Sequence, residues 1–186
     1  MKILLIDNHS KHTKELIEQL GHESIVLDYK KIDLKTTSAD DYDAIILSGG
    51  NTSIINHENE YSSEIELIKS STKPVLGICL GFELIAKAFD EKLERLPVKT
   101  SGFINIRICD DDKVFDDLPV FFQAYQSHIY HVKELAHLKK IALSSTGIEA
   151  FKHSEKMIYG MQFHPEMSEE ARIIIKNFLM IISADI

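Results

Sequence analysis

The chain has 186 residues, of which 44% are hydrophobic and 27% are charged. This length and apolar fraction fit one compact unit with a sizeable core, and we expect a single domain over residues 1–186. Acidic residues outnumber basic ones by 29 to 21, giving a formal charge of −8, and no lysine- or arginine-rich block is present. The charge pattern disfavours nucleic acid and anionic membranes as partners, which leaves small molecules and proteins.

The N-terminus and the cysteines predict the compartment. The opening stretch MKILLIDN is too short an apolar run for a signal peptide, and no stretch of the sequence approaches the length of a membrane span. The two cysteines, Cys79 and Cys109, lie in different sequence contexts and do not form the pattern of a disulfide framework. Their number and placement favour a reducing compartment. We therefore expect a cytoplasmic protein.

Apolar runs alternate with helical patterns through the first half of the chain. Helical patterns are found before Gly21, a natural residue for the end of a helix, and over Glu60–Lys69 and Phe82–Phe89. Strands that alternate with helices predict a parallel sheet. The runs suited to strands buried on both faces are Lys2–Ile6, Ser24–Leu27, Ala44–Leu47 and Val75–Ile78.

After Leu93 the pattern changes to short β-prone segments, which fit antiparallel or mixed strands at the edge of the sheet. Ser154–Lys156 is a plausible hairpin turn, and Glu169–Ile181 is a closing amphipathic helix. The predicted fold class is α/β, with a three-layer, open, mostly parallel central sheet, flanking helices and additional antiparallel edge strands. The β-prone segments are Phe103–Ile108, Val120–Tyr125, Lys140–Ser144, Glu149–His153 and Met157–Phe163.

The stretch GICLG at residues 77–81 places Cys79 between a predicted strand and a predicted helix. This is the arrangement of a nucleophile elbow, with cysteine in place of serine. Flanking glycines permit the tight turn, the start of the helix favours a thiolate, and the amide of Leu80 would face an oxyanion formed at a substrate carbonyl. The alternative is a small buried cysteine in an ordinary turn, which the elbow alone leaves open.

A catalytic cysteine needs an acid and base beside it, and His164 follows the predicted strand Met157–Phe163. Pro165 biases His164 toward an extended backbone, and Glu166 could accept the other ring N–H and hold the tautomer. The alternative for this tripeptide alone is a solvated loop. In combination with the cysteine elbow, the tripeptide favours a Cys-His-Glu catalytic group.

These motifs carry a resemblance to a known family. GICLG at 77–81, IYGMQFHPE at 158–166 and ILSGG at 46–50 resemble the class I, triad-type glutamine amidotransferases, in that family's order across nearly the whole chain. The resemblance implies a flavodoxin-like fold in one glutamine amidotransferase domain. The chain is most similar to the branch that supplies ammonia for GMP synthesis, through IDN at 6–8, LSGG at 47–50, Ser127-His128 and KNFL at 176–179.

The resemblance also implies the catalytic roles. Cys79 would be the nucleophile, His164 the acid and base, and Glu166 the residue that orients the histidine. The amides of Gly50 and Leu80 would form the oxyanion hole.

The glutamine pocket implied by the resemblance is lined by Glu83, Ser127 and His128. Glu83 stands where the family has glutamine, so an acceptor-only carboxylate replaces a neutral amide. It would pair with the substrate ammonium, clash with a substrate oxygen or, if protonated, act as a donor, and the sequence leaves these alternatives open. Asn51 replaces a common proline, and Tyr130 stands where members of the GMP branch usually have aspartate.

The implied reaction is hydrolysis of L-glutamine to glutamate and ammonia through a glutamyl thioester. The sequence has no G-x-x-x-x-G-K-[ST] loop and no room for a synthetase domain, so we expect no cofactor in this chain. Ammonia would pass to a separate synthetase subunit. This partner would be an ATP-pyrophosphatase that uses ATP and magnesium to convert XMP to GMP. The alternatives are a stand-alone hydrolase of γ-glutamyl amides or peptides, and a binding or regulatory subunit whose catalysis Glu83 impairs.

The remaining polar features have structural interpretations. His128 and His131 have no third ligand at a recognisable spacing, so no metal site is predicted. We expect His9 and His12 at the surface, Cys109 as an unreactive strand thiol, and Asp110–Asp112 as a solvated turn.

Overall fold

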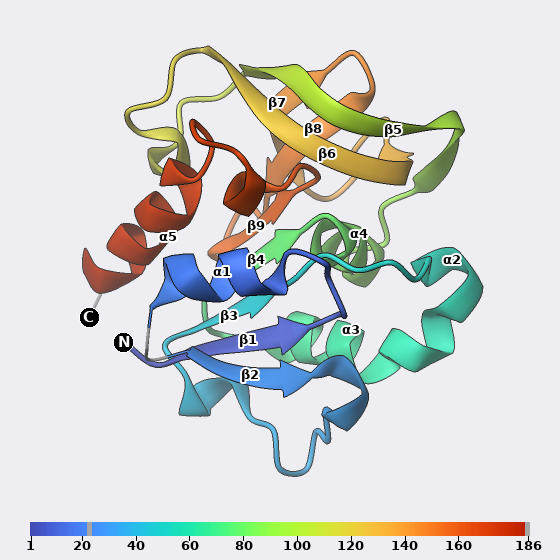
Figure 1. Ribbon diagram of the computed structural model, residues 1–186. Helices are drawn as coiled ribbons and strands as arrows, with labels where there is room; N and C mark the ends of the chain where they lie inside the picture. Colours follow the sequence, from blue (N-terminus) through green and yellow to red (C-terminus); the bar gives the residue numbers. More distant parts are fainter. Residues whose placement is uncertain (22–23, 185–186) are drawn as a thin grey trace.

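A nine-stranded sheet runs through the described part of the chain, residues 1–21 and 24–184 of the computed structural model (Figure 1). The strands are β1 (Ile3–Asp7), β2 (Ser24–Asp28), β3 (Ala44–Leu47), β4 (Val75–Ile78), β5 (Leu93–Ile108), β6 (Phe121–Val132), β7 (Lys139–Ser144), β8 (Gly147–Lys152) and β9 (Ile158–Met161). Their order across the sheet is β2-β1-β3-β4-β9-β8-β6-β5-β7.

Five strands form the parallel part of the sheet. β1 pairs in parallel with β2 and β3, β3 pairs with β4, and β4 pairs with β9. Every residue of β3, β4 and β9 is buried, as expected for strands that are covered on both faces. The predicted α/β class with a mostly parallel central sheet is confirmed.

The antiparallel part begins at β8, which runs against β9 across the predicted hairpin turn at residues 154–156. β5 and β6 form a long antiparallel pair, and β7 pairs with both β5 and β8. The sequence predicted only Phe103–Ile108 and Val120–Tyr125 in the long pair. Both strands extend further because their outer segments pair with each other, from Leu93 opposite Val132 onward.

The second strand differs from its prediction. Ser24–Leu27 has the composition of a strand buried on both faces, but β2 is the outer strand of the parallel part, and Ile25 and Val26 are 44% and 46% exposed. A strand at the edge of a sheet has one hydrogen-bonded neighbour and less cover, which composition alone does not reveal.

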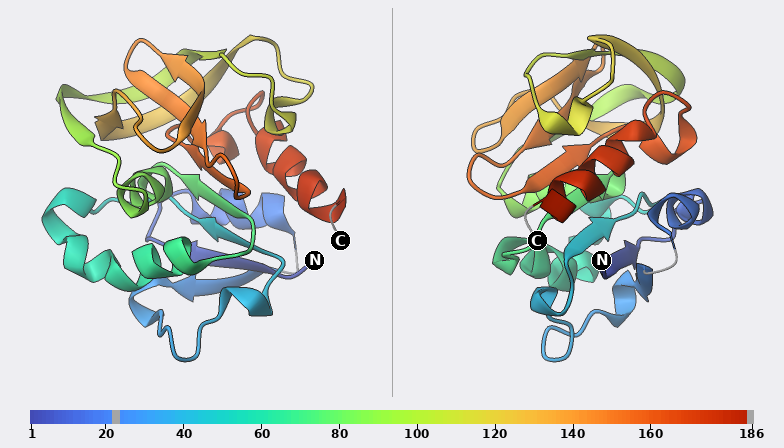
Figure 2. Two further views of the ribbon diagram at one scale, coloured as in Figure 1. Left: turned by 180° about the vertical axis from the view of Figure 1, so that it is seen from behind. Right: turned by 90° about the vertical axis from the view of Figure 1, so that its left-hand side faces the viewer.

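Helices cover both faces of the parallel part (Figure 2). α1 and α5 lie on one face, while α3 and α4 lie on the other, and each face has its own apolar cluster. The clusters draw on alternate residues of β1, with Ile3 and Leu5 in one and Leu4 and Ile6 in the other. The helices are α1 (Thr13–Leu20), α2 (Ile54–His57), α3 (Ser62–Ser70), α4 (Leu80–Ala88) and α5 (Ile173–Ala184).

Short 3₁₀ helices complete the connections, at Tyr29–Lys31, Ala39–Asp41, Glu58–Tyr61, Lys113–Phe115 and Pro165–Met167. No helix among the described residues is both long enough and apolar enough to cross a membrane.

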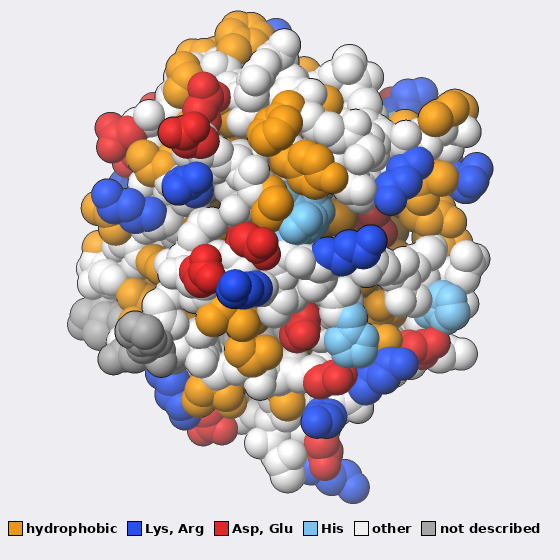
Figure 3. Space-filling view, in the orientation of Figure 1, with side chains coloured by type: hydrophobic (Ala, Val, Ile, Leu, Met, Phe, Trp, Pro, Cys, Tyr) orange, Lys and Arg blue, Asp and Glu red, His pale blue; other side chains and the backbone are white. Residues whose placement is uncertain are grey.

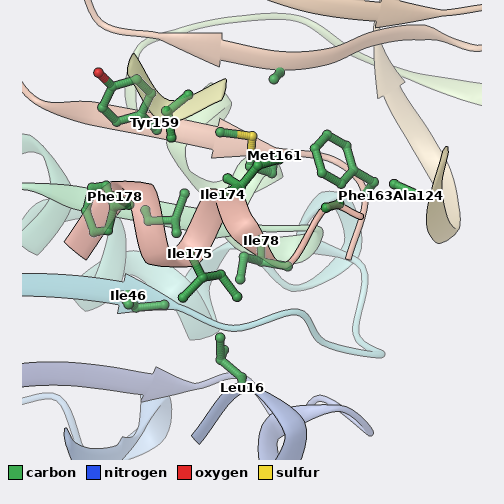
Figure 4. Packing of buried hydrophobic residues seen from close by; sticks show 14 of the residues in the cluster. Leu16, Ile46, Ile78, Ala124, Tyr159, Met161, Phe163, Ile174, Ile175 and Phe178 are labelled. Atoms are coloured by element: carbon green, nitrogen blue, oxygen red, sulfur yellow. The ribbon is translucent and has the colours of Figure 1, made fainter. Parts of the chain in front are cut away.

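The closing helix packs its apolar face onto the sheet (Figure 4). Ile174, Ile175 and Phe178 are buried in one cluster with Met161, and the ring of Phe178 meets Tyr159 edge-on at 6.1 Å between centroids. The helix begins at Ile173 rather than at the predicted Glu169, after a segment of turns.

The prediction of a solvated turn at Asp110–Asp112 is wrong for Asp112. Asp112 is 8% exposed, and its carboxylate accepts hydrogen bonds from the Val114 amide and the Tyr159 hydroxyl and pairs with Lys152. The carboxylate therefore caps the 3₁₀ helix that follows. Nearby Cys109 is partly buried, and burial raises the pKa of its thiol, as expected for an unreactive cysteine.

The buried ring of Phe178 offers a test of this packing. Phe178→Ala should lower the free energy of unfolding by about 3–5 kcal/mol, because it removes a fully buried ring and leaves a cavity. Met180→Ala, on the same helix but 59% exposed, should change it by less than about 0.5 kcal/mol. Chemical denaturation measures both values, and equal losses would contradict the packing described here.

Candidate active site

The candidate site lies where the carboxyl ends of four parallel strands meet. Asn8 follows β1, Gly49 and Gly50 follow β3 by way of Ser48, Cys79 follows β4, and a short segment after β9 leads to His164. Crevices at this edge of an open α/β sheet are where such folds bind ligands.

Cys79 occupies a sharp turn between β4 and α4. Its backbone has φ 53° and ψ −101°, an unfavourable conformation for a residue with a side chain. The glycines on either side make the turn possible: a Cβ on Gly77 would lie 2.4 Å from the carbonyl oxygen of Gly81, and one on Gly81 would lie 2.6 Å from that of Leu47. The geometry is that of the predicted nucleophile elbow.

His164 and Glu166 are joined at the end of β9. His164 Nδ1 lies 2.7 Å from Glu166 Oε1, and both side chains are almost fully buried. The backbone N–H of His164 donates to the carbonyl of Tyr125 at 2.8 Å, which anchors the segment to β6. Glu166 reaches back because Pro165 starts a 3₁₀ turn immediately after the histidine.

His164 and Cys79 flank the same glycine. A Cβ on Gly49 would lie 2.9 Å from His164 Cε1 and 3.4 Å from Cys79 Cβ. Burial of the imidazole disfavours its charge, but Cys79 and Glu166 outweigh this effect and raise the pKa of His164 to about 10. The imidazole is therefore protonated beside the sulfur, with the ring proton at Nδ1 held by Glu166.

Gly50 and Leu80 lie side by side next to Cys79. A Cβ on Gly50 would lie 2.5 Å from Leu80 Cδ2 and 2.6 Å from the carbonyl oxygen of Asn8, so the backbone comes as close as a glycine allows. Leu80 is the first residue of α4, and the amide of a first helical residue has no partner within its helix. Both residues line the pocket in front of Cys79, as their predicted oxyanion roles require.

The pocket has a volume of about 320 Å³, within the range of small-molecule sites. Ser127 lies close to the nucleophile, with its carbonyl oxygen 4.0 Å from Cys79 Sγ. On the face of the molecule shown in Figure 3, acidic and basic side chains are interspersed rather than gathered by sign. The pocket is lined by the three predicted residues Glu83, Ser127 and His128, and also by His12, Lys99 and Tyr125.

Glu83 is buried in the wall of this pocket. Burial raises the pKa of its carboxyl to about 8, although the neighbouring Gln162 favours the charged form. At about pH 7 the side chain is therefore mainly a neutral acid, which can donate one hydrogen bond and accept others.

His128 lines the pocket, and both of its ring nitrogens are engaged in a buried polar chain. Burial lowers its pKa to about 4, so the ring is neutral. Nδ1 lies 2.8 Å from the carbonyl of Tyr130, and Nε2 lies 2.9 Å from the amide oxygen of Gln126, whose nitrogen lies 2.6 Å from Thr100 Oγ1. A neutral ring cannot donate at both nitrogens, so we infer that the Gln126 amide is rotated, with its nitrogen toward His128.

His12, expected at the surface, is only partly exposed, because it lies in the wall of the pocket. Its ring lies edge-on to that of His164, with centroids 5.1 Å apart, and it lines the pocket. Burial and the proximity of His164 lower the pKa of His12, so a neutral ring covers the catalytic pair. His9, by contrast, is exposed as expected and contacts Asp28.

Sequence reasoning did not place Lys99 in the site, and it considered Tyr125 only as one of several aromatic residues that could stack on a ligand. Lys99 lies in the irregular stretch of β5 between Arg95 and Thr100, and Tyr125 forms a bridge with His164. Both positions depend on pairings between distant segments, for which the local sequence has no signal. The described residues hold no cluster of three potential metal ligands, at His128 and His131 or elsewhere.

Comparison with known families identifies this architecture. The family model "Glutamine amidotransferase class-I" matches residues 4–182. The chain belongs to the class-I glutamine amidotransferase family.

Individual relatives and structures agree with this assignment. The glutamine-hydrolysing subunit of GMP synthase from Methanococcus vannielii is 36% identical, over 95% of this chain and 94% of the relative. The protein of the same name from Pyrococcus abyssi is 35% identical, over 95% and 96% of the two chains. A crystal structure from Thermoplasma acidophilum, of a protein assigned as a GMP synthase subunit, superimposes with a TM-score of 0.89 at 25% identity, covering 99% of this chain and 94% of the other.

The pairing of Cys79 with His164 predicts how the thiol reacts. In a Cys109→Ser background, alkylation of Cys79 by iodoacetamide should depend on His164, because a protonated imidazole beside the sulfur favours the reactive thiolate form. His164→Gln should slow alkylation about tenfold or more near pH 7, with a rate that climbs as pH rises. Mass spectrometry follows both rates, and superimposable pH profiles would rule out the pair.

Proposed function

We propose that this chain hydrolyses L-glutamine and passes the ammonia to a separate synthetase subunit that makes GMP from XMP. The main support is a strained cysteine that shares one glycine neighbour with a histidine bonded to a buried carboxylate, in a pocket of small-molecule size. Membership of the class-I glutamine amidotransferase family supports the glutaminase step, and the names of the relatives support GMP synthesis as its destination.

The first half-reaction follows from the positions of the side chains. The Cys79 thiolate attacks the carboxamide carbon of glutamine, and the oxygen becomes an oxyanion facing the amides of Gly50 and Leu80. His164, protonated and held by Glu166, donates a proton to the departing nitrogen. The C–N bond breaks, ammonia leaves, and a glutamyl thioester remains on Cys79.

The second half-reaction uses the same groups in reverse. His164 has given up its proton and can now take one from a water molecule that attacks the thioester. The amides of Gly50 and Leu80 again face the oxyanion. The C–S bond breaks, glutamate leaves, and the Cys79 thiolate and His164 imidazolium are restored.

The ammonia released at this site needs an acceptor. We propose that the partner is an ATP-pyrophosphatase subunit, with ATP and magnesium bound there, and we assign no cofactor to this chain. We propose that the reaction contributes to purine biosynthesis in the cytoplasm.

The unusual Glu83 is compatible with this function when it is neutral. A protonated carboxyl has one donor and one carbonyl acceptor, so it can replace the amide that the family has at this position. An ionised carboxylate would place a negative charge in a pocket that must hold an oxyanion. We propose that glutamine binds to the form with neutral Glu83.

The nucleophile can be tested in the complex with the synthetase partner. Cys79→Ala should reduce glutamine-dependent GMP formation by at least about 10³-fold, because no thioester can form. GMP formation from added ammonium salts should be unchanged, since it bypasses this site. Glutamine hydrolysis that persists in Cys79→Ala would overturn the mechanism, and hydrolysis of γ-glutamyl amides without any response to the partner would favour a stand-alone hydrolase.

The charge state of Glu83 gives a prediction on pH. Labelling of Cys79 by a diazoketone analogue of glutamine should be within about threefold in wild type and Glu83→Gln near pH 7, where both side chains are neutral. At about pH 9, wild type should bind the reagent about tenfold more weakly than Glu83→Gln, because the carboxyl with a pKa of about 8 has ionised.

The half-saturating reagent concentration, measured by mass spectrometry at each pH, gives the comparison. The reagent and His164 titrate in the same way in both proteins, so their effects cancel in the ratio of the two half-saturating concentrations. If the half-saturating concentrations of wild type and Glu83→Gln changed in parallel with pH, the proposed neutral form of Glu83 would be contradicted. Labelling of Glu83→Gln without labelling of wild type would instead support the impaired binding subunit.

A further inference from the structure

A second buried acid, Glu64, lies behind the candidate oxyanion hole. It belongs to α3, is 1% exposed, and is not among the residues that line the pocket. Its Oε1 accepts a hydrogen bond from Asn8 Nδ2 at 3.0 Å, while Oε2 is buried without a hydrogen-bond partner among the described residues. Burying a carboxyl group costs free energy unless hydrogen bonds compensate. The hydrogen bond from Asn8 is the one that Glu64 accepts, so Asn8 is the residue that Glu64 can hold in place.

Asn8 is the link between this acid and the site. Its backbone N–H donates to Ser48 Oγ at 2.8 Å, and its side-chain nitrogen also donates to the Ser48 carbonyl at 3.2 Å. Ser48 in turn donates from Oγ to the carbonyl of Gly49 at 2.9 Å. The end of β1 is thereby tied to the segment that carries Gly49 and Gly50.

This segment has no room to shift without moving the site. A Cβ on Gly50 would overlap both the Asn8 carbonyl and the Leu80 side chain at the start of α4, so the segment lies closely between them. Gly49 lies against His164 and Cys79. The distance from the Gly50 amide to the reacting carbonyl thus depends on where Asn8 is held.

We propose that Glu64 is a positioning residue that holds the Gly49–Gly50 segment in its oxyanion-binding geometry through Asn8. The proposal rests on the proposed glutaminase function. Burial raises the pKa of Glu64 to about 8, so near pH 7 the acid is neutral and adds little charge behind the developing oxyanion. Donors must lie at the oxyanion position for full effect, and loss of one costs about 10²–10³-fold in rate in a comparable enzyme site.

The test compares two variants of Glu64. Glu64→Leu fills the space but cannot accept the hydrogen bond from Asn8, whereas Glu64→Gln can accept it. The probe is a diazoketone analogue of glutamine, whose carbonyl takes the place of the carboxamide and becomes an oxyanion when Cys79 attacks. Glu64→Leu should lower the maximal labelling rate by about tenfold or more, with half-saturation within about twofold of wild type. Glu64→Gln should restore the wild-type rate.

A matched control separates positioning from stability. Leu67→Ala removes a buried side chain from the same helix without touching the hydrogen-bond chain. It should lower the unfolding temperature and leave the maximal labelling rate of the folded protein unchanged. Circular dichroism at the labelling temperature checks that every variant is folded.

The outcomes are distinguishable. If wild type is labelled and Glu64→Leu reacts at the same maximal rate while folded, the positioning role is overturned and the glutaminase proposal stands. If Leu67→Ala loses as much labelling rate as Glu64→Leu, the effect is one of general stability and the role is again overturned. If wild type itself is not labelled at Cys79, the proposed function fails and this role fails with it. Should Glu64→Leu remain unfolded, failure of folded Glu64→Gln to match wild type would decide against the proposal.

Discussion

The site depends on one strained turn. Cys79 adopts a positive φ that a residue with a side chain avoids, at a cost on the order of 1–3 kcal/mol. The turn is maintained because β4 is buried between β3 and β9 and because Gly77 and Gly81 approach each other where a Cβ would overlap backbone atoms. The turn places Cys79 in the lining of the pocket, at the N-terminus of α4.

His164, the proposed acid and base, is fixed from the other side of that turn. β9 pairs directly with β4, so the segment that leaves β9 must pass Cys79, and its link to Tyr125 of β6 fixes where it passes. Burial alone would discharge the imidazole, yet Glu166 and Cys79 reverse that effect. The order of the strands therefore decides whether His164 lies beside Cys79. If β9 were not the neighbour of β4, the histidine and the thiol would be apart.

Sequence patterns predict those parts of this structure that local residues determine. The buried strands β3 and β4, the elbow and the His-Pro-Glu segment all follow from short motifs, and β3 and β4 have the predicted bounds. The predictions were wrong for the exposed edge strand at Ile25 and for the buried Asp112, and they did not place His12 beside His164. Each of these positions depends on which distant segment lies beside the residue. The role of a carboxylate at Glu83 could not be assigned from the sequence for the same reason, since burial decides whether it is charged.

Two acids near an oxyanion site raise a common question of charge. An ionised carboxylate in a low-dielectric interior would oppose both the thiolate of Cys79 and the oxyanion that follows it. Glu64 and Glu83 are each surrounded by protein rather than by cations, and burial raises the pKa of each to about 8. Glu166 differs because it faces His164 at 2.7 Å, where a negative charge stabilises the imidazolium. In the proposed mechanism these three buried acids therefore differ by their neighbours. Glu166 meets the imidazolium and acts as a charge, whereas Glu64 and Glu83 meet no cation and are compatible with catalysis only as neutral groups.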